Sequence, residues 1–281
     1  AAGLSAGAPA GAAIVTNLLQ DQLLSRDEAD RLLALCHAVN PVIVIHVIAF
    51  GFFGDIRLGW FLLAVHWLSL LLTGFIYSRG RGKVKTVPRS RTIAGPGPIS
   101  LGKQLGDAVA DATMTTMKVG GTIIMFAVLI KTAEIAVISL LAQPAHPFLD
   151  QGLSASLSAV LEIHLGAYRI SEWNVFSPAM VTVFLSAMIG WGGLSSHLQV
   201  QSVVRGPMRY GRFVQFRLVH AVIAVMISFI GWNIWLAERS APSSIVLPTV
   251  SADRYFPLPL GWGWLFALAA ALLLLFLFVS V

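Results

Sequence analysis

Residues 191–203, WGGLSSHLQVQSV, are polar for their position in the sequence, directly after the apolar run AMVTVFLSAMIG. They include two glycines, three serines, one histidine and two glutamines. An unwound segment at Gly190, Gly192 and Gly193 would free backbone groups. A helix restarting near Ser195 would then direct its N–H groups and positive dipole end at the gap. This pattern predicts a polar ligand site inside a broken membrane helix.

The polar side chains of this segment fall on two faces of the expected helix. Ser195, Gln199 and Ser202 share one face by their i, i+4, i+7 spacing, while His197 and Gln201 lie on another. Two polar faces leave little surface for lipid, so we expect protein and water around this half-helix. The alternative is hydrogen bonding between small residues packed in a helix bundle, without any ligand.

Glu162 is the second candidate for chemistry. It lies in SAVLEIHLG, among apolar residues, and an ionisable group at membrane depth is a functional candidate by default. It could bind a coupling proton or cation, and the structural alternative is a pair with Arg169. His164 follows closely, but one glutamate and one histidine do not make a zinc site, so we expect no metal.

Two further pairs of titratable residues have structural explanations. Lys131 and Glu134 are spaced i, i+3 and are expected to neutralise each other rather than to gate a pathway. Asp107 and Asp111 share a helix face, which we assign to a solvated interface rather than to magnesium. The chain has no HExxH, Walker, GxGxxG or GxSG motif, so we expect neither an enzyme nor a cofactor.

The composition predicts an all-α polytopic protein of a cell membrane. Hydrophobic residues make up 57% of the chain and charged residues 11%, with a mean hydropathy of +0.79, which soluble domains rarely reach. Residues 79–91, RGRGKVKTVPRSR, hold six basic residues and no acid. Beside apolar spans, they predict a cytoplasmic loop in contact with the bilayer rather than a nucleic-acid site. Cys36 is the single cysteine, which excludes an intrachain disulfide.

Local signals place the helices that must position these residues. Ser25 and Glu28 fit a capping box, and Asn40-Pro41 marks a kink or a break in the helix that follows. Residues 152–172 are too polar and short for an ordinary span and are predicted to form half of a re-entrant hairpin. An amphipathic helix is expected from about Ser100. The expected spans cover residues 58–78, 119–142, 178–204 (interrupted), 213–237 and 258–281.

The same sequence of elements occurs twice. We divide the chain into a first repeat with a hairpin remnant and basic loop (1–92), an amphipathic helix with a connecting span (93–142), a second repeat (143–237), and a loop with a final span (238–281). If the basic loops 79–91 and 205–212 are both cytoplasmic, the two broken helices run in opposite directions. Inverted repeats with discontinuous helices are typical of secondary transporters, whose site lies between the repeats.

Five strings identify a family resemblance. LLSRDEADRLLALCHAVNP, MFAVLIK, LEIHLGAYRIS, GGLSSHLQVQSV and RLVHAVIA occur in the order found in YlbJ-type sporulation integral membrane proteins. These belong to the nucleoside-recognition (Gate) domain proteins and are similar in plan to concentrative nucleoside transporters. The resemblance covers nearly all of residues 3–237. The family has further N-terminal spans, and the start AAGLSAGAPAG lacks a basic n-region, so we expect a fragment without a cleavable signal peptide.

The resemblance implies a transporter that moves dipicolinic acid from the mother cell toward the forespore, with the forespore outer membrane as its location. This sequence departs from the family pattern at His37, where asparagine is usual, and at His164-Leu165, where a threonine-asparagine type pair is usual. By the resemblance, the positions that line the substrate site are Pro9, Gly11, Asn40, Pro41, Glu162, Gly166, Gly193, Ser195, His197 and Gln199.

The chemistry of these positions fits the anionic substrate that the resemblance implies. Dipicolinate is planar and carries two carboxylates, which suits helix N-termini at two breaks with serine, asparagine and histidine donors. A nucleoside or another small metabolite is the alternative substrate; a nucleoside needs aromatic stacking and fits Glu162 better, since that carboxylate would repel a dianion unless paired or protonated. A non-transporting membrane scaffold or gate component is the alternative from another class. A homo-oligomer stays open.

Overall fold

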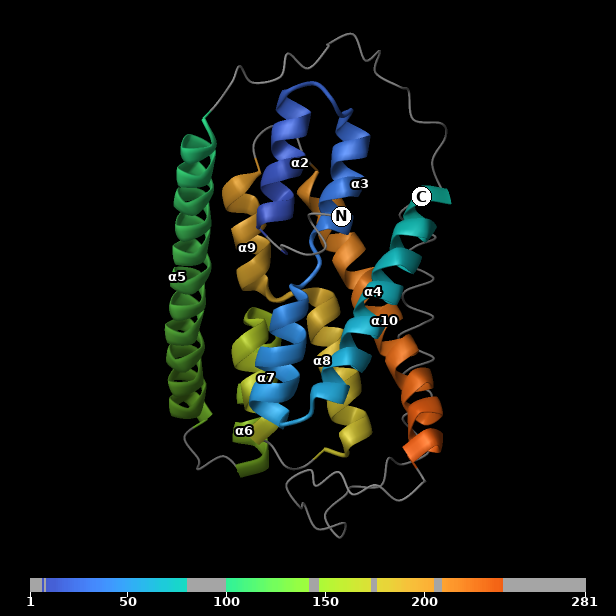
Figure 1. The fold of residues 1–281 in the computed structure, drawn as a ribbon. Coiled ribbons are helices and arrows are strands. Elements are labelled where there is room, and N and C mark those ends of the chain that lie inside the picture. The colour runs from blue at the N-terminus through green and yellow to red at the C-terminus, as the bar shows by residue number, and fades with distance from the viewer. Residues whose placement is uncertain are drawn as a thin grey trace.

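The structure, a computed structural model, describes residue 7 and residues 9–79, 100–141, 147–172, 176–204 and 209–239. Over these ranges the chain is helical without any strand (Figure 1), which confirms the predicted all-α class. Residues 80–91 of the basic segment and the predicted final span 258–281 lie outside the described ranges. The helices are α2 (Ala10–Gln20), α3 (Arg26–Cys36), η1 (Ile43–Phe52), α4 (Ile56–Arg79), α5 (Leu101–Leu141), α6 (Pro147–Leu161), α7 (Ile163–Glu172), α8 (Pro178–Trp191), α9 (Gly193–Val203) and α10 (Tyr210–Arg239).

α2 and α3 form an antiparallel pair. The predicted capping box is confirmed: the Ser25 hydroxyl accepts a hydrogen bond from Glu28 N at 3.3 Å, and the Glu28 carboxylate accepts one from Ser25 N at 2.8 Å. These bonds satisfy N–H groups that a helix start leaves free, and they fix the beginning of α3. Gly11 permits close packing, because a Cβ there would lie 2.5 Å from Cys36 O.

The predicted kink at Asn40-Pro41 is a true helix break. α3 ends at Cys36, and Asn40 opens the next helical segment by accepting from Val42 N at its side-chain oxygen, at 2.8 Å. Proline has no N–H and disfavours helical geometry in the residue before it, so the helix cannot continue through this point. The half that follows, η1, is a π-helix, a wide form often found at functional sites.

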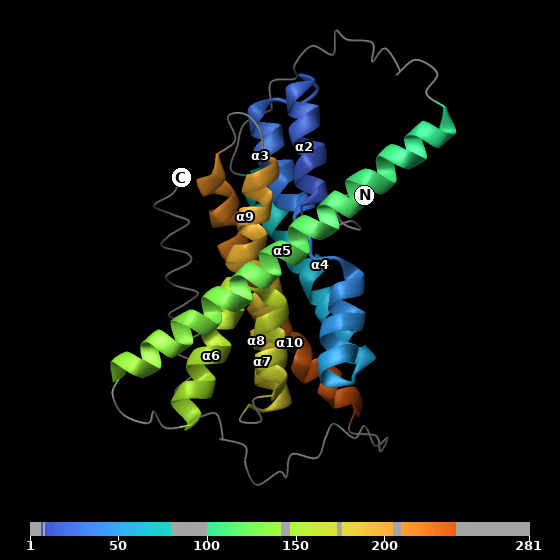
Figure 2. The same ribbon diagram turned by 90° about the vertical axis from the view of Figure 1, so that its left-hand side faces the viewer.

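α5 joins two expected elements, since the amphipathic helix was predicted to lead into the span. The amphipathic helix predicted from Ser100 and the span predicted at 119–142 form one continuous helix of 41 residues, about 62 Å long at 1.5 Å per residue. Without a proline in this segment, each added residue gains a hydrogen bond, so nothing ends the helix between its two parts. Figure 2 shows α5 leaning diagonally across the other helices.

Residues 147–172 hold both arms of a helical hairpin, rather than the half hairpin predicted for 152–172. Glu162 alone joins α6 to α7. The arms cross closely because Gly166 has no side chain: a Cβ there would lie 2.6 Å from Ala159 Cα. With 15 and 10 residues, neither arm is long enough to cross a bilayer.

The second predicted break lies at Gly192 and Gly193, whose φ angles are +93° and +75°. Both angles are in the left-handed region, which glycine adopts without strain from a Cβ. The prediction that Gly190 is unwound is wrong, because this residue belongs to α8. Gly190 instead allows α8 to approach α10, since a Cβ there would lie 2.6 Å from Ala221 Cα. α9 restarts at Gly193, before the predicted Ser195.

The two broken helices run in opposite directions along the bundle. In Figure 1, α3 and η1 descend from the end where the α2–α3 turn lies, whereas α8 and α9 ascend toward it. α4 ends and α10 begins at that same end. The helix ends that flank the two basic segments therefore share one end of the bundle, as the positive-inside rule requires of two cytoplasmic loops.

Four described helical segments are long and apolar enough to cross a membrane: Ile56–Ser78, Leu101–Val137, Pro178–Val203 and Tyr210–Ile234. They overlap four of the predicted spans, which confirms a multi-pass membrane protein. The apolar helices Ala10–Gln20 and Ile43–Phe52 are shorter. α2 and η1 therefore fit the bundle as parts of discontinuous elements rather than as separate spans.

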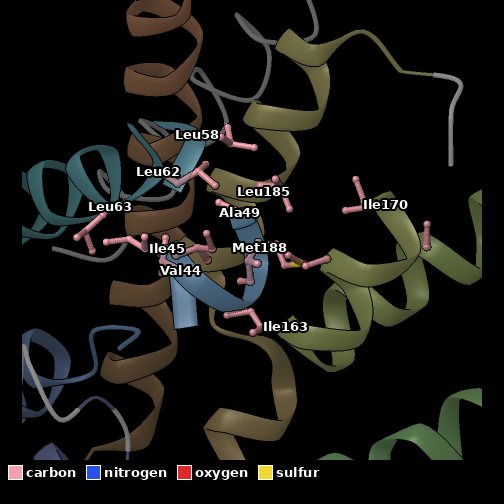
Figure 3. Close-up of a cluster of buried hydrophobic side chains, with 14 residues drawn as sticks. Val44, Ile45, Ala49, Leu58, Leu62, Leu63, Ile163, Ile170, Leu185 and Met188 are labelled. Atoms are coloured by element: carbon pink, nitrogen blue, oxygen red, sulfur yellow. The ribbon is translucent and has the colours of Figure 1, made fainter. Parts of the chain in front are cut away.

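Two clusters of buried apolar side chains lie on opposite sides of the breaks. The first cluster (Figure 3) joins η1, α4, α7 and α8 through residues such as Val44, Leu62, Ile163, Leu185 and Met188. The second cluster joins α2, α3, α9 and α10 through Val15, Leu33, Val200 and Phe213. Each broken helix contributes one half to each cluster. Two apolar layers therefore hold the polar breaks between them.

Candidate functional site

A cavity of about 430 Å³ lies where both helix breaks and the tip of the α6–α7 hairpin meet α5. Four of the ten predicted site residues line it: Asn40, Glu162, Ser195 and Gln199. The other polar lining residues are His37, Thr115, Thr116, His164 and Ser196. Ala38, Val39, Ile43, Val119, Gly120, Ile123, Ile163 and Gly192 complete the described lining, which contains no phenylalanine, tyrosine or tryptophan.

Three helical segments begin at this cavity, each with free N–H groups and the positive end of its dipole. Two of these starts carry a cap. Asn40 Oδ1 accepts from Val42 N before η1, and Glu162 Oε2 accepts from Leu165 N in α7, both at 2.8 Å. The third start, at α9, has no side-chain cap because its N-cap residue is Gly192. The start of α9 is thus the one best suited to an anion among these three.

Ser195 and Gln199 add free polar side chains beside this uncapped start. They are spaced i, i+4 on α9, line the cavity, and are 2% and 8% exposed. Neither side chain forms a hydrogen bond with another residue in the described part of the chain. A hydroxyl and an amide both donate and accept, so the pair offers donors to a ligand without breaking an existing bond.

Ser196 and His37 connect the two breaks. The Ser196 hydroxyl donates to Gly192 O and Gly193 O, at 2.6 and 2.9 Å, so its proton is already in use. His37 Nε2 lies 3.2 Å from the Ser196 hydroxyl oxygen and must therefore donate to it. This assigns the proton of a neutral His37 to Nε2. Its Nδ1 is buried and has no partner among the described residues.

The carboxylate of Glu162 is engaged within its own hairpin. Glu162 is 1% exposed, and its Oε1 lies 2.7 Å from His164 Nδ1 while Oε2 caps α7. The alternative pair with Arg169 is wrong for this residue, because Arg169 lies 3.7 Å from Glu134 instead. Glu134 also contacts Lys131 at 3.5 Å, as predicted from their spacing. Glu162 is therefore a partly compensated charge in the cavity wall.

Arg217 of α10 holds the backbone at both breaks. It is fully buried and donates from Nη1 to His37 O at 3.0 Å, from Nη2 to Ile189 O at 3.1 Å and from Nε to Trp191 O at 3.3 Å. These carbonyls lie at the C-terminal ends of α3 and α8, where a helix leaves acceptors unsatisfied. One side chain thus satisfies carbonyl groups from both broken helices.

A pair of buried histidines supports the first break from the opposite side. His66 Nε2 accepts a hydrogen bond from Val39 N at 3.1 Å. His220 Nε2 donates to His66 O at 3.1 Å, and the two rings lie 4.9 Å apart. Through these contacts α4 and α10 both reach the break between α3 and η1.

His197 does not line the cavity. Its Nε2 donates to Trp191 O at 3.1 Å, and its Nδ1 lies 3.1 Å from the Tyr210 hydroxyl. Its ring also packs on Trp191, with 4.2 Å between the ring centroids. Both ring nitrogens already have partners, so His197 positions the second break through its bond to Trp191 O rather than by contact with a ligand.

The remaining predicted positions lie around the cavity without lining it. Pro9 is the N-cap residue of α2, and Gly11 packs that helix on α3. Pro41 follows the first break, and Gly166 lies at the crossing of α6 and α7. A Cβ on Gly193 would lie 3.2 Å from Ile163 N, so this glycine lets the start of α9 approach the hairpin tip.

Comparison with known proteins identifies the family of this chain. In an alignment of 257 residues that covers 83% of the chain, the chain is 30% identical to the sporulation integral membrane protein YlbJ of Bacillus subtilis (strain 168). The chain belongs to the YlbJ-type family. It spans 63% of the length of that relative. No family model matches the chain, and no solved structure is significantly similar to it.

Some cavity residues of this YlbJ-type chain were not predicted as site positions. Thr115 and Thr116 come from α5, which carries no break, and only the polar run TMTTMK in an apolar helix signals them. Ser196 lies next to Ser195, and the sequence does not show that these two identical residues have different roles. Arg217 was detectable, since a lone arginine in FVQFRLVHAVIAV is an intramembrane charge.

Outside the cavity, four charged residues join the α2–α3 pair to the start of α10. Arg209 pairs with Asp27 and with Asp30, the latter at 2.6 Å, and Arg212 lies 3.0 Å from Asp27. Hydrogen bonds from Arg209, and then from Arg212, lower the pKa of Asp27 below its usual value of 3.8. This charge cluster links α3 to the start of α10.

A second cavity, of about 530 Å³, is larger but less suited to chemistry. It lies between α6, α8 and α10 and is lined mainly by apolar residues such as Ala155, Phe184, Met188 and Leu218. Within the described ranges, no three histidine, cysteine, aspartate or glutamate side chains gather into a metal site. The polar cavity at the helix breaks is therefore the candidate functional site.

Proposed function

We propose that this chain is part of a membrane transporter for a small organic anion, with dipicolinate as the substrate, and that the substrate binds in the polar cavity at the helix breaks. The observation that carries the proposal is the uncapped start of α9, with the side chains of Ser195 and Gln199 beside it, which have no hydrogen-bond partner among the described residues. Free N–H groups and hydroxyl or amide donors at a helix N-terminus bind carboxylates.

The lining of the cavity favours a planar dicarboxylate over a nucleoside. A nucleoside base is held by stacking on aromatic side chains, and the described lining has no such ring apart from the imidazoles of His37 and His164. Donors converge on the cavity from both breaks: the amide nitrogen of Asn40, the Ser195 hydroxyl and the start of α9. Two carboxylates on one rigid ring can use donors on different walls.

The charge of Glu162 does not exclude an anion. Its carboxylate already accepts from Leu165 N and contacts His164 Nδ1, so part of its negative charge is balanced inside the hairpin. A dicarboxylate would therefore meet a carboxylate with two hydrogen-bond partners rather than a free one.

The opposite directions of the broken helices support an inverted repeat, with the α6–α7 hairpin entering the membrane from one side and α2 from the other. In this proposal the breaks lie near the bilayer midplane, where such repeats place the substrate. The relative from Bacillus subtilis is named as a sporulation integral membrane protein, which supports a role in spore formation. We propose the forespore outer membrane as the location.

The second candidate is a nucleoside or another small metabolite, and Glu162 favours it as an acceptor for hydroxyl or amino groups. Full-length protein in proteoliposomes should therefore be tested for uptake of radiolabelled dipicolinate and of uridine. We expect saturable dipicolinate uptake that falls at least tenfold when Ser195→Ala and Gln199→Leu are combined, and that is unchanged in Ser202→Ala, an exposed control on α9. Uptake of uridine alone would select the second candidate. Uptake of neither would support a scaffold.

A further inference from the structure

Arg217 is a buried cation without a carboxylate among its described partners. The three groups it contacts are the backbone carbonyls of His37, Ile189 and Trp191. The described ion pairs of the protein join other residues. Burying a charge is costly unless an opposite charge or several dipoles offset it. Here carbonyl dipoles offset part of the charge, and no described carboxylate neutralises the rest.

The guanidinium lies directly behind the cavity wall. Its Nη2 is 3.3 Å from the position that a Cβ on Gly192 would occupy, and Gly192 lines the cavity. The same position is 3.2 Å from His37 Nε2, whose ring lines the cavity as well. Glycine at this point leaves no side chain between the guanidinium and the break. The positive charge therefore acts on the cavity across one residue of backbone, through a medium of low dielectric constant.

The geometry points to Arg217 as the residue that makes the cavity select an anion, and we infer that it does so as a positioning residue, without touching the ligand. This inference rests on the proposed function. Arg217 fixes the C-terminal ends of α3 and α8, and thereby the direction in which the start of α9 faces the cavity. Its charge adds to the dipole of α9, so a dicarboxylate gains an attraction that a neutral molecule of the same shape does not.

The alternative is that Arg217 only fastens the two breaks together. Both explanations predict that its loss weakens the fold, so stability alone does not separate them. Selectivity between a charged ligand and its neutral isostere separates the two explanations, because loosened breaks would weaken the binding of both ligands alike. Arg217→Lys is the matched variant, since it keeps the charge and loses the planar fork that reaches three carbonyls.

The test measures dissociation constants of pyridine-2,6-dicarboxylate and of its neutral diamide for full-length protein, Arg217→Lys and Arg217→Gln. In Arg217→Gln we expect the dicarboxylate to bind about tenfold more weakly or worse, as the loss of one nearby charge predicts. Diamide binding should change far less, and it also reports an intact site. Arg217→Lys should keep the preference for the dicarboxylate while melting at a lower temperature.

Each outcome decides one claim. Equal weakening of both ligands in Arg217→Gln, or an unchanged preference, overturns the inference and leaves the proposed function standing. If Arg217→Gln does not fold, Arg217→Lys decides, since a folded lysine variant without preference also overturns the inference. Wild-type protein that binds no dicarboxylate overturns the proposed function itself, and with it the role assigned to Arg217.

Discussion

His37 and Ser196 are 159 residues apart in the chain, yet His37 Nε2 lies 3.2 Å from the Ser196 hydroxyl. This contact joins the end of α3 to the start of α9, and so joins the two helix breaks. Ser196 meanwhile holds the carbonyls of Gly192 and Gly193. The preceding residue, Ser195, has no side-chain hydrogen bond within the described chain and lines the cavity. The two adjacent serines therefore have different roles: Ser196 holds the backbone of the break, and Ser195 faces the cavity.

This difference predicts opposite results for two adjacent substitutions. Ser196→Ala removes a hydroxyl that serves two carbonyls and His37, and should lower the free energy of unfolding by about 1 kcal/mol. Ser195→Ala should leave it within about 0.5 kcal/mol but weaken dipicolinate binding. Thermal melting and ligand titration of both variants check the prediction. Equal melting temperatures combined with equal affinities would contradict it.

The glycines of the second break are predicted to be sensitive to alanine. Gly192 and Gly193 have positive φ, where a Cβ costs about 1–2 kcal/mol per residue. Gly193→Ala would also press on Ile163 N, 3.2 Å from the added carbon. Gly121→Ala is the control, because nothing lies within 4 Å of its Cβ position in α5; it should stabilise the helix by about 0.5–1 kcal/mol. Equal melting temperatures for Gly193→Ala and the control would refute this explanation of the break.

The charge cluster at the basic end predicts a pH-dependent contribution to stability. The pKa of Asp27 is lowered in the folded protein, so its stabilisation is present above the usual pKa of 3.8 and is lost as the pH falls through the folded value. Asp27 is 56% exposed at its side chain, so at neutral pH Asp27→Asn should cost only about 0.2–1 kcal/mol. The difference from wild type should vanish in acid well below pH 3.8. A difference that persists there would contradict the assignment.

Asp30 provides the matched comparison within the same cluster. Its side chain is 3% exposed and accepts from Arg209 Nε at 2.6 Å and from Arg209 N at 3.1 Å. Asp30→Asn should therefore destabilise the fold by about 1.5–3 kcal/mol, more than Asp27→Asn does. Denaturation of both variants in parallel measures the order. The reverse order would show that burial does not set the strength of these pairs.

Glu162 is predicted to act mainly as the cap of α7. Glu162→Gln keeps a side-chain oxygen for Leu165 N, whereas Glu162→Ala removes it and should cost about 1 kcal/mol more. Dipicolinate binding should survive Glu162→Gln, since the substrate does not need this charge. If wild type binds uridine but not dipicolinate, and Glu162→Gln loses uridine binding, Glu162 would instead be a ligand of a nucleoside.

The sequence was most informative where one residue type decides the backbone. The capping box at Ser25, the break at Asn40-Pro41 and the unwound backbone at Gly192 each follow from local stereochemistry, and all three are confirmed. Local signals failed where two segments had to be placed relative to each other. Gly190 resembles Gly192 in sequence, yet it serves packing against Ala221, which only the fold reveals.

The candidate site shows the same limit. Glu162, Ser195 and Gln199 were predicted from buried polar residues and Asn40 from the family resemblance, and the structure brings them to one cavity. Its fourth wall comes from the unbroken α5, whose contribution depends on how that helix crosses the bundle. The position of Arg217 behind Gly192 depends on a contact between α10 and α8, and no local pattern predicts it.

The most direct test of the central claim is the affinity of full-length protein for dipicolinate, measured by isothermal titration with Ser195→Ala combined with Gln199→Leu. The exposed Ser202→Ala serves as the control on the same helix. Saturable binding to wild type and to the control, weakened at least tenfold in the double variant, is the predicted result. Binding that is absent from wild type, or equally strong in the double variant, would contradict a dicarboxylate site at the start of α9.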